Sequence, residues 1–247
     1  MNDSWTLLAI VIGSFLLAGS VKGVIGMGLP TVSMGLLGLA LPPAQAAALL
    51  VLPAMLTNLW QMAVGPHLAR VARRLFTLQL GVCAGTWAST GVLTGTSSGL
   101  ASGALGAVLV AYSVTGLLEV HFHVPRRIER WLSPAIGVAT GLITGATGIF
   151  VVPAVPYLAA LDQERDELIQ ALGLSFVVSS AALGVSLAAG GAFDKASPPA
   201  MAAALGAALA GMWIGQRFRG RLDPAVFRRS FFVGLLTVGL YMVWRAI

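Results

Sequence analysis

Charged residues are scarce in this chain. They make up 10% of its 247 residues, whereas a soluble domain carries about 25%. Hydrophobic residues account for 57%, and the mean hydropathy is +0.88. No hydrophilic stretch is long enough for a soluble domain, and several apolar runs approach the ~20 residues that span a bilayer. We therefore expect one integral membrane domain, solvated by the lipid bilayer, that fills the chain.

Several classes of chemistry lack the residues that they need. The single cysteine, Cys83, excludes an intrachain disulfide and a cysteine-based metal site. The three histidines, His67, His121 and His123, lie near loops, so an intramembrane Ser–His hydrolase would have no base. No Walker A motif is present, and no Asp or Glu lies in the middle of an apolar segment. We expect a protein that is not an enzyme and that uses no metal and no cofactor.

The net positive charge of +6 is concentrated in loops. Eleven of the fifteen basic residues lie in three short segments, namely Arg70, Arg73 and Arg74; Arg126, Arg127 and Arg130; and Arg217, Arg219, Arg221, Arg228 and Arg229. This distribution is typical of cytoplasmic loops of membrane proteins and argues against nucleic acid as a partner. The first apolar run has no basic residues ahead of it, so we expect it to remain as a helix.

Ten apolar segments are expected, five in each half of the chain. They cover about Trp5–Ile25, Pro30–Leu41, Ala44–Val64, Leu75–Thr94 and Leu100–Val120, and then Trp131–Thr147, Phe150–Leu161, Leu168–Ala189, Pro198–Gln216 and Phe227–Ala246. The second segment of each half has only about 12 residues, or roughly 18 Å of helix, short of the ~30 Å hydrocarbon core. We expect these two segments to be partial helices.

With the arginine-rich loops in the cytoplasm, counting the crossings places both termini outside and gives the two halves opposite orientations. The predicted fold is an all-α polytopic membrane protein with two inverted repeats, residues 1–125 and 126–247. Each repeat is expected to contain a glycine-broken hairpin with a short partial helix. The acidic segment Asp162–Glu167 fits this topology poorly, although acidic residues contribute little to orientation.

Two glycine-rich breaks stand at matching positions in the two halves. The first is VKGVIGMGLP at Val21–Pro30, and the second is TGLITGATG at Thr140–Gly148, with Pro153 after it. Paired interruptions are the best sequence pointer to a transporter's binding site. Proline suits the first turn of a helix, and the free N–H groups of that turn attract anions. The alternative is that the glycines only allow helices to cross closely.

Lys22 is the only charge deep in an otherwise apolar stretch. Such a charge is costly in a membrane and indicates function, and a lysine beside a helix N-terminus calls for an anionic ligand. The alternative is that the side chain snorkels to a nearby interface. The expected counterpart of Lys22 in the second half is Thr140, so the ligand would be held asymmetrically.

Other polar residues in and near the breaks complete the predicted substrate-binding set. Their side chains can hydrogen-bond a ligand or simply join helices. The set comprises Lys22, Gly26, Gly28, Thr31, Gln45, Asn58, Gln61, Thr144, Gly145, Thr147, Gly148 and Gln170. Gln45 and Gln170 stand near the starts of corresponding segments, and Ser175, Ser179 and Ser180 are the second half's polar residues in place of Asn58 and Gln61.

Small residues four positions apart recur, as in Gly19/Gly23, Gly81/Gly85, Gly137/Gly141/Gly145 and Gly211/Gly215. They permit close backbone approach between helices. We interpret them as packing positions, and a homodimer remains a possible assembly.

Four segments carry a family resemblance. They are KGVIGMGLP at Lys22–Pro30, LPPAQAAALLVLP at Leu41–Pro53, and TGLITGATGIFVVPAVPYL with LIQALGLSF in the second half. With them the chain resembles the sulfite exporter TauE/SafE family over essentially its whole length. The resemblance implies a multi-pass protein of the bacterial inner membrane that transports small anions such as sulfite and sulfonates. Many members have a fuller glycine run in the first motif, whereas here Leu29 and Pro30 follow Gly28 directly.

The sequence thus predicts a secondary transporter that exports a small anion, bound between the two repeats near the breaks. A passive anion channel is the alternative within the same class. A membrane scaffold or accessory subunit for a sulfur-metabolism enzyme is the alternative from another class.

Overall fold

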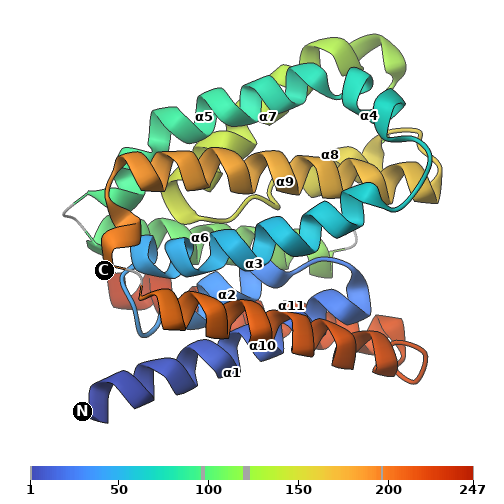
Figure 1. The fold of residues 1–247 in the computed structure, drawn as a ribbon. Coiled ribbons are helices and arrows are strands. Elements are labelled where there is room, and N and C mark those ends of the chain that lie inside the picture. The colour runs from blue at the N-terminus through green and yellow to red at the C-terminus, as the bar shows by residue number, and fades with distance from the viewer. Residues whose placement is uncertain (1, 96–97, 119–122, 196, 247) are drawn as a thin grey trace.

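The computed structural model describes residues 2–95, 98–118, 123–195 and 197–246, and within these ranges the chain is entirely helical (Figure 1). The α-helices are α1 (Asn2–Ile25), α2 (Leu29–Leu37), α3 (Pro43–Ala63), α4 (Leu68–Arg74), α5 (Phe76–Thr94), α6 (Ser98–Leu117), α7 (Arg126–Thr147), α8 (Ala154–Ala160), α9 (Arg165–Ala189), α10 (Pro198–Phe218) and α11 (Pro224–Ala246). A short 3-10 helix, η1 (Ala192–Lys195), follows α9. Six of the helices, α1, α3, α6, α9, α10 and α11, contain a span long and apolar enough to cross a bilayer.

The helix ends follow the glycines and prolines of the sequence, with four departures from expectation. The helix α7 begins at Arg126, directly after Pro125, rather than at Trp131. The helix α2 ends at Leu37 rather than Leu41: Gly38 caps it, Leu39 and Ala40 form tighter turns that donate to the carbonyl oxygens of Leu36 and Leu37, and Pro42 disfavours helical geometry at Leu41. Gly148 has a left-handed backbone and Pro153 disfavours helical geometry at Val152, and α8 begins at Ala154 rather than at Phe150. The helix α4 was not expected, since it lies in a basic loop.

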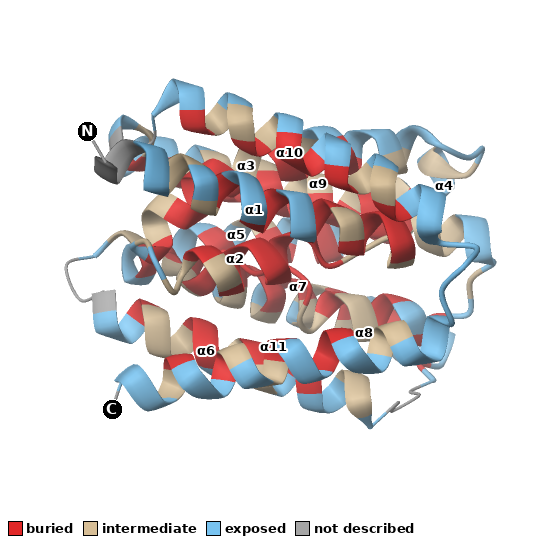
Figure 2. Ribbon diagram, turned by 90° about the horizontal axis from the view of Figure 1, so that it is seen from below, coloured by how far each residue is buried: buried red, intermediate tan, exposed pale blue. Residues whose placement is uncertain are grey.

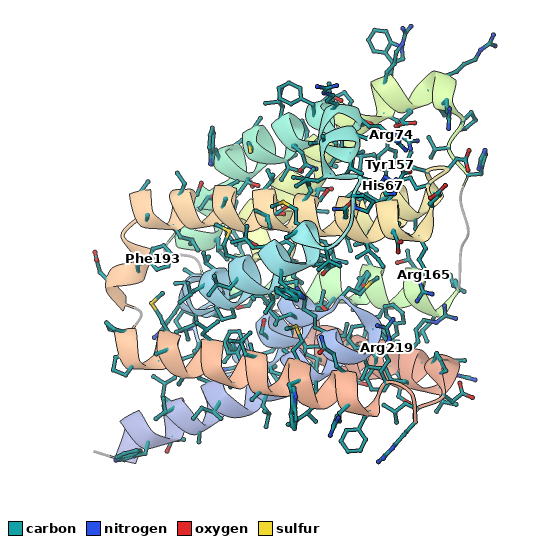
Figure 3. All side chains as sticks on the ribbon, turned by 45° about the vertical axis from the view of Figure 1, so that its right-hand side comes forward. His67, Arg74, Tyr157, Arg165, Phe193 and Arg219 are labelled. Carbon is teal, nitrogen blue, oxygen red and sulfur yellow. The ribbon has the colours of Figure 1, made fainter. Side chains whose placement is uncertain are left out.

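The long helices run between two ends of the molecule. Both termini lie at one end and α4 lies at the opposite end (Figures 1 and 2). Arg74, Arg165 and Arg219 lie at the α4 end, whereas Phe193 of η1 lies at the other (Figure 3). We call the first the arginine-rich end; it comprises α4, the start of α7 and the α10–α11 connection. We call the opposite end, which holds both termini, the terminal end. Buried residues line the inward faces of the helices (Figure 2).

Two helix pairs cross with backbone against backbone. A Cβ atom added at Gly19 or Gly23 of α1 would collide with the carbonyl oxygens of Ala208 and Met212 in α10. In the second half, a Cβ atom added at Gly141 or Gly145 of α7 would collide with the carbonyl oxygens of Val82 and Thr86 in α5. The recurring glycines are therefore packing positions.

The helices α6 and α11 form a third close pair. A Cβ atom on Gly106 would lie 2.9 Å from the carbonyl oxygen of Gly239, and one on Gly239 would lie 2.9 Å from that of Gly106. A fourth extensive contact joins α3 to α9. Together these four pairs make up most of the helix packing and hold α2 and the connection from Gly148 to Pro153 in the interior.

Candidate functional site

Lys22 lies in the last turn of α1, and its side chain points into the protein. The residue is only 6% exposed. Its ammonium group donates hydrogen bonds to Thr57 Oγ1, at 3.0 Å, and to Asn58 Oδ1, both on α3. The side chain therefore does not snorkel to an interface. Within the described residues none of the three ion pairs involves Lys22, so its charge is met by neutral dipoles alone.

The local sequence of α3 orients these acceptors. Pro53 lies inside the helix, and Thr57 Oγ1 donates to the carbonyl oxygen of Pro53 at 2.8 Å. Because that hydroxyl hydrogen is used within the helix, its lone pairs face Lys22. Asn58 is buried beside it. The sequence prediction included Asn58 but missed Thr57, whose signal is its place beside Asn58 and four residues after a proline.

The first break follows Lys22 directly. The N–H group of Gly26 donates to the carbonyl oxygen of Lys22 at 2.7 Å, and Gly26 has φ 80°. A Cβ atom at Gly26 would meet nothing within 4 Å, so the backbone there is approachable. Gly28, with φ 103°, precedes α2, whose first turn has no side-chain cap. Thr31 is buried and donates to the carbonyl oxygen of Gly28 at 3.0 Å.

The second break has the same cap geometry at Gly148, with φ 75°. The N–H group of Gly148 donates to the carbonyl oxygen of Thr144 at 2.7 Å, as that of Gly26 does to Lys22. The geometry therefore matches Lys22 with Thr144, rather than with Thr140 as expected from the sequence. Thr147 Oγ1 donates to the carbonyl oxygen of Ile143 at 2.7 Å and accepts the N–H group of Ile149 at 3.2 Å.

The two breaks lie at different depths. A Cβ atom at Gly148 would meet Met34 of α2 and Ala47 of α3. Along α3, Ala47 stands about 17 Å from Asn58. The structure thus brings together Lys22, Thr57 and Asn58 around the first break, and it places the second break about three turns away toward the terminal end.

The remaining predicted residues bond to backbone groups, pack against another helix or lie far from Lys22. Gly145 packs against α5. Gln170 accepts the N–H group of His67 at 2.8 Å and donates to the carbonyl oxygens of Met62 and Gly65. Gln61 donates to the carbonyl oxygen of Ile169 at 3.4 Å. Gln45 is half-buried at the start of α3, about 20 Å from Asn58 along the helix.

An ionic cluster closes the arginine-rich end of the second half. Arg74 makes two hydrogen bonds to the carboxylate of Glu129, at 2.6 and 2.8 Å. This hydrogen bonding raises the pKa of the Arg74 guanidinium above its ordinary value. Tyr157, which lies near Arg74 in Figure 3, shares a hydrogen bond of 2.6 Å with Ser133. The cluster ties α4 and α8 to α7.

The acidic segment that fitted the predicted topology poorly also lies at this end. Glu167 pairs with Arg70 at 2.8 Å, and Asp162 pairs with Arg126 at 3.8 Å. The acidic side chains therefore face the basic loops and partly neutralise them.

One comparison with known proteins found a match. The family model described as "Sulfite exporter TauE/SafE" matches residues 11–242. No curated protein and no solved structure matches the chain.

Proposed function

Because the chain belongs to the sulfite exporter TauE/SafE family, we propose that it is a secondary transporter that exports sulfite, a sulfonate or a related organosulfur anion. Members of this family are membrane transporters and not enzymes, and the chain is accordingly a multi-pass membrane protein that handles small anions. The inner membrane of a bacterium is consistent with the family.

The buried ammonium group of Lys22 carries the proposal for the binding site. A lysine ammonium has three N–H donors, and Thr57 and Asn58 accept two of them. A buried charge without a counter-ion is costly, so an anion that accepts the third hydrogen would stabilise the site. The uncapped first turn of α2 supplies N–H groups nearby, and the open space beside Gly26 lets an anion approach. We assign substrate binding to Lys22, Gly26, Gly28, Thr31 and Asn58, with Thr57 added.

Matching contacts support two inverted repeats, residues 1–125 and 126–247. If α1, α2, α3, α5 and α6 correspond to α7, α8, α9, α10 and α11, the α1–α10 pair corresponds to the α7–α5 pair. The α3–α9 and α6–α11 pairs then correspond to themselves, as a two-fold axis requires. These four pairs make the four most extensive helix–helix contacts of the described structure. The helix α1 begins at the terminal end and α7 begins at the arginine-rich end, which gives the halves opposite directions (Figure 1).

In this arrangement each half contributes a glycine-broken hairpin, α1–α2 and α7–α8. The second break, with Thr144, Thr147 and Gly148, lines the translocation route at another depth. Gln45, Gln61, Gly145 and Gln170 belong to the surrounding frame, because most of them hold backbone or another helix. The arginine-rich end is cytoplasmic, and both termini lie outside.

Flux of labelled sulfite into liposomes that hold only this protein tests the proposal. We expect saturable flux from the wild type. Lys22→Ala should weaken sulfite binding about 10- to 100-fold, since a hydrogen bond to a charged group contributes about 1.5–3 kcal/mol. Lys22→Arg should restore it only in part, because the guanidinium has a different geometry. Arg126→Gln, which removes an exposed positive charge, is the matched control. Wild-type affinity in Lys22→Ala would remove Lys22 from the site.

A further inference from the structure

Four buried polar atoms have no hydrogen-bond partner within the described part of the chain, and all four lie on three mutually contacting helices, α5, α7 and α9. They are Oε1 of Gln79 and Oγ1 of Thr86 on α5, Oγ1 of Thr140 on α7, and Oγ of Ser179 on α9. In the part of the chain that the structure describes, no other buried side-chain oxygen or nitrogen is without a partner. Buried polar groups are normally paired, so such a cluster needs an explanation.

The three hydroxyl groups differ from most other buried hydroxyl groups of the protein in where they point. Serine and threonine in helices commonly donate to a carbonyl oxygen one turn earlier, as Thr90, Thr144 and Ser180 do here. Thr86, Thr140 and Ser179 make no such bond. Their hydroxyl groups therefore have no partner among the described residues and can bind another group.

Packing does not require polar side chains at these positions, as the corresponding helices α1, α3 and α10 demonstrate. The carbonyl oxygen of Thr86 packs against Gly145 of α7, and the carbonyl oxygen of Met212 packs against Gly23 of α1. Because Gly145 and Gly23 hold matching positions, Thr86 corresponds to Met212. Thr140 precedes Gly141 as Ala18 precedes Gly19, and Gln79 then corresponds to Leu205.

Matching Gln170 with Gln45 places Ser179 opposite Ala54. The corresponding helices α1, α3 and α10 carry apolar residues at all four positions, and α10 packs on α1 and contacts α3 as α5 packs on α7 and contacts α9. The polar side chains on α5, α7 and α9 are therefore not needed for the packing.

The positions follow one line through the molecule. Gln79 lies one turn from the start of α5, at the arginine-rich end, and donates to Ser175 of α9 at 2.8 Å. Ser179 lies one turn further along α9, and Thr86 lies two turns further along α5. Thr140 is one turn before Thr144, which stands at the second glycine break. The line connects the arginine-rich end to that break.

We propose that Gln79, Thr86, Thr140 and Ser179 line a hydrated path along which the anion moves between the arginine-rich end and the second break. The inference rests on the proposed transport function and adds residues to it. Hydroxyl and amide groups can replace part of an ion's hydration shell, as in the linings of other pores and carriers. All four residues are buried, so the path is closed in this conformation. The Arg74–Glu129 pair stands at its cytoplasmic mouth.

Cysteine labelling in liposomes tests the path, starting from the Cys83→Ser protein. The test variants are Thr140→Cys and Ser179→Cys, and the matched controls are Ala18→Cys and Ala54→Cys at the corresponding apolar positions. The reagent is sulfonatoethyl methanethiosulfonate, an anionic probe that reacts with hydrated thiols. We expect the test cysteines to react more than about tenfold faster than the controls, because only a hydrated lining admits the probe, and we expect sulfite to slow them. Equal rates, or no reaction at any position, would overturn the path.

A second measurement covers variants that fail to fold. Thr140→Val and Gln79→Leu introduce the apolar character of the corresponding positions on α1 and α10, so the melting temperature should be kept or raised while sulfite flux per folded molecule falls. Wild-type flux in both variants would overturn the path. If the wild type transports sulfite in a Lys22-dependent way and the labelling fails, only the path is wrong. If the wild type itself carries no sulfite, the proposed function is wrong.

Discussion

Lys22 is held by oxygen dipoles rather than by a carboxylate, and this choice of partners keeps its charge available. A buried ammonium paired with Asp or Glu would be neutralised and would no longer attract an anionic ligand. With Thr57 and Asn58 as acceptors, the positive charge remains for a ligand. The identity of residue 58 therefore decides whether the site can hold an anion.

Asn58→Asp tests this reasoning with almost no change of shape. The new carboxylate would form an ion pair with Lys22, so the substrate would lose its counter-charge. We expect sulfite binding and flux to fall below detection, while the melting temperature stays the same or rises. Thermal unfolding and flux are measured on the same purified protein. Normal transport in Asn58→Asp would show that Lys22 does not bind the anion.

At the scale of helices, the glycines of the two breaks serve different purposes. Gly26 has a positive φ and open space around it, whereas Gly145 lies within a helix against α5. The sequence suggested one role for both, because both belong to glycine-rich motifs. The distinction depends on which helix passes behind each glycine, and that is set by tertiary packing.

Paired substitutions separate the two roles. Gly26→Ala should cost about 1–2 kcal/mol of folding free energy for the left-handed backbone, and Gly26→Leu should add little further loss of stability while flux falls with side-chain size. Gly145→Ala should instead lower the melting temperature strongly, because its Cβ atom collides with the carbonyl oxygen of Thr86. Flux per folded molecule should then change little. Equal effects of Gly26→Ala and Gly145→Ala on both quantities would refute the distinction.

The attachment of α4 supplies a further comparison. Arg74 is 25% exposed and makes two hydrogen bonds to Glu129, whereas Arg70 is 73% exposed and makes one to Glu167. Arg74→Gln should lower the free energy of unfolding by about 2 kcal/mol, and Arg70→Gln should lower it by less than about 0.5 kcal/mol. Thermal or denaturant unfolding in one detergent measures both. A larger loss from Arg70→Gln would contradict the assigned anchoring role of Arg74.

Local signals predicted the helices well and the contacts poorly. The C-terminal ends of α1, α5, α7, α9 and α11 agree with the sequence prediction, and a glycine directly follows each of the first four. The correspondence of Lys22 with Thr144 could not be predicted from the sequence, because it depends on the backbone geometry at Gly26 and Gly148. The partnership of Lys22 with Thr57 joins residues from two helices, and no spacing along the chain encodes it.

For the whole molecule, the direction of the chain relative to the membrane is the main consequence of the fold. Both termini lie at the end opposite α4 (Figures 1 and 2), and the positive-inside tendency places the α4 end in the cytoplasm. Cysteines introduced near Arg73 and Arg127 of the Cys83→Ser protein should therefore be labelled only from the cytoplasmic side. A cysteine near residue 2 should be labelled only from outside. Labelling of both regions from the same side would contradict the arrangement.

The distinction between a carrier and a channel also belongs to the whole molecule. A carrier exposes one site to alternate sides, so anion on one side of the membrane drives exchange with anion on the other. A channel lets each anion pass independently. The closed cluster at Arg74 and Glu129 and the buried position of Lys22 favour a carrier.

Counterflow in liposomes is the most direct test. Vesicles that contain only this protein are loaded with unlabelled sulfite and diluted into a trace of labelled sulfite, with the membrane potential clamped. We predict that the labelled anion accumulates transiently above its external concentration, and that Lys22→Ala and Asn58→Asp abolish the overshoot. A monotonic approach to equilibrium in the wild type, or an overshoot that survives both substitutions, would contradict transport by a carrier with Lys22 at its binding site.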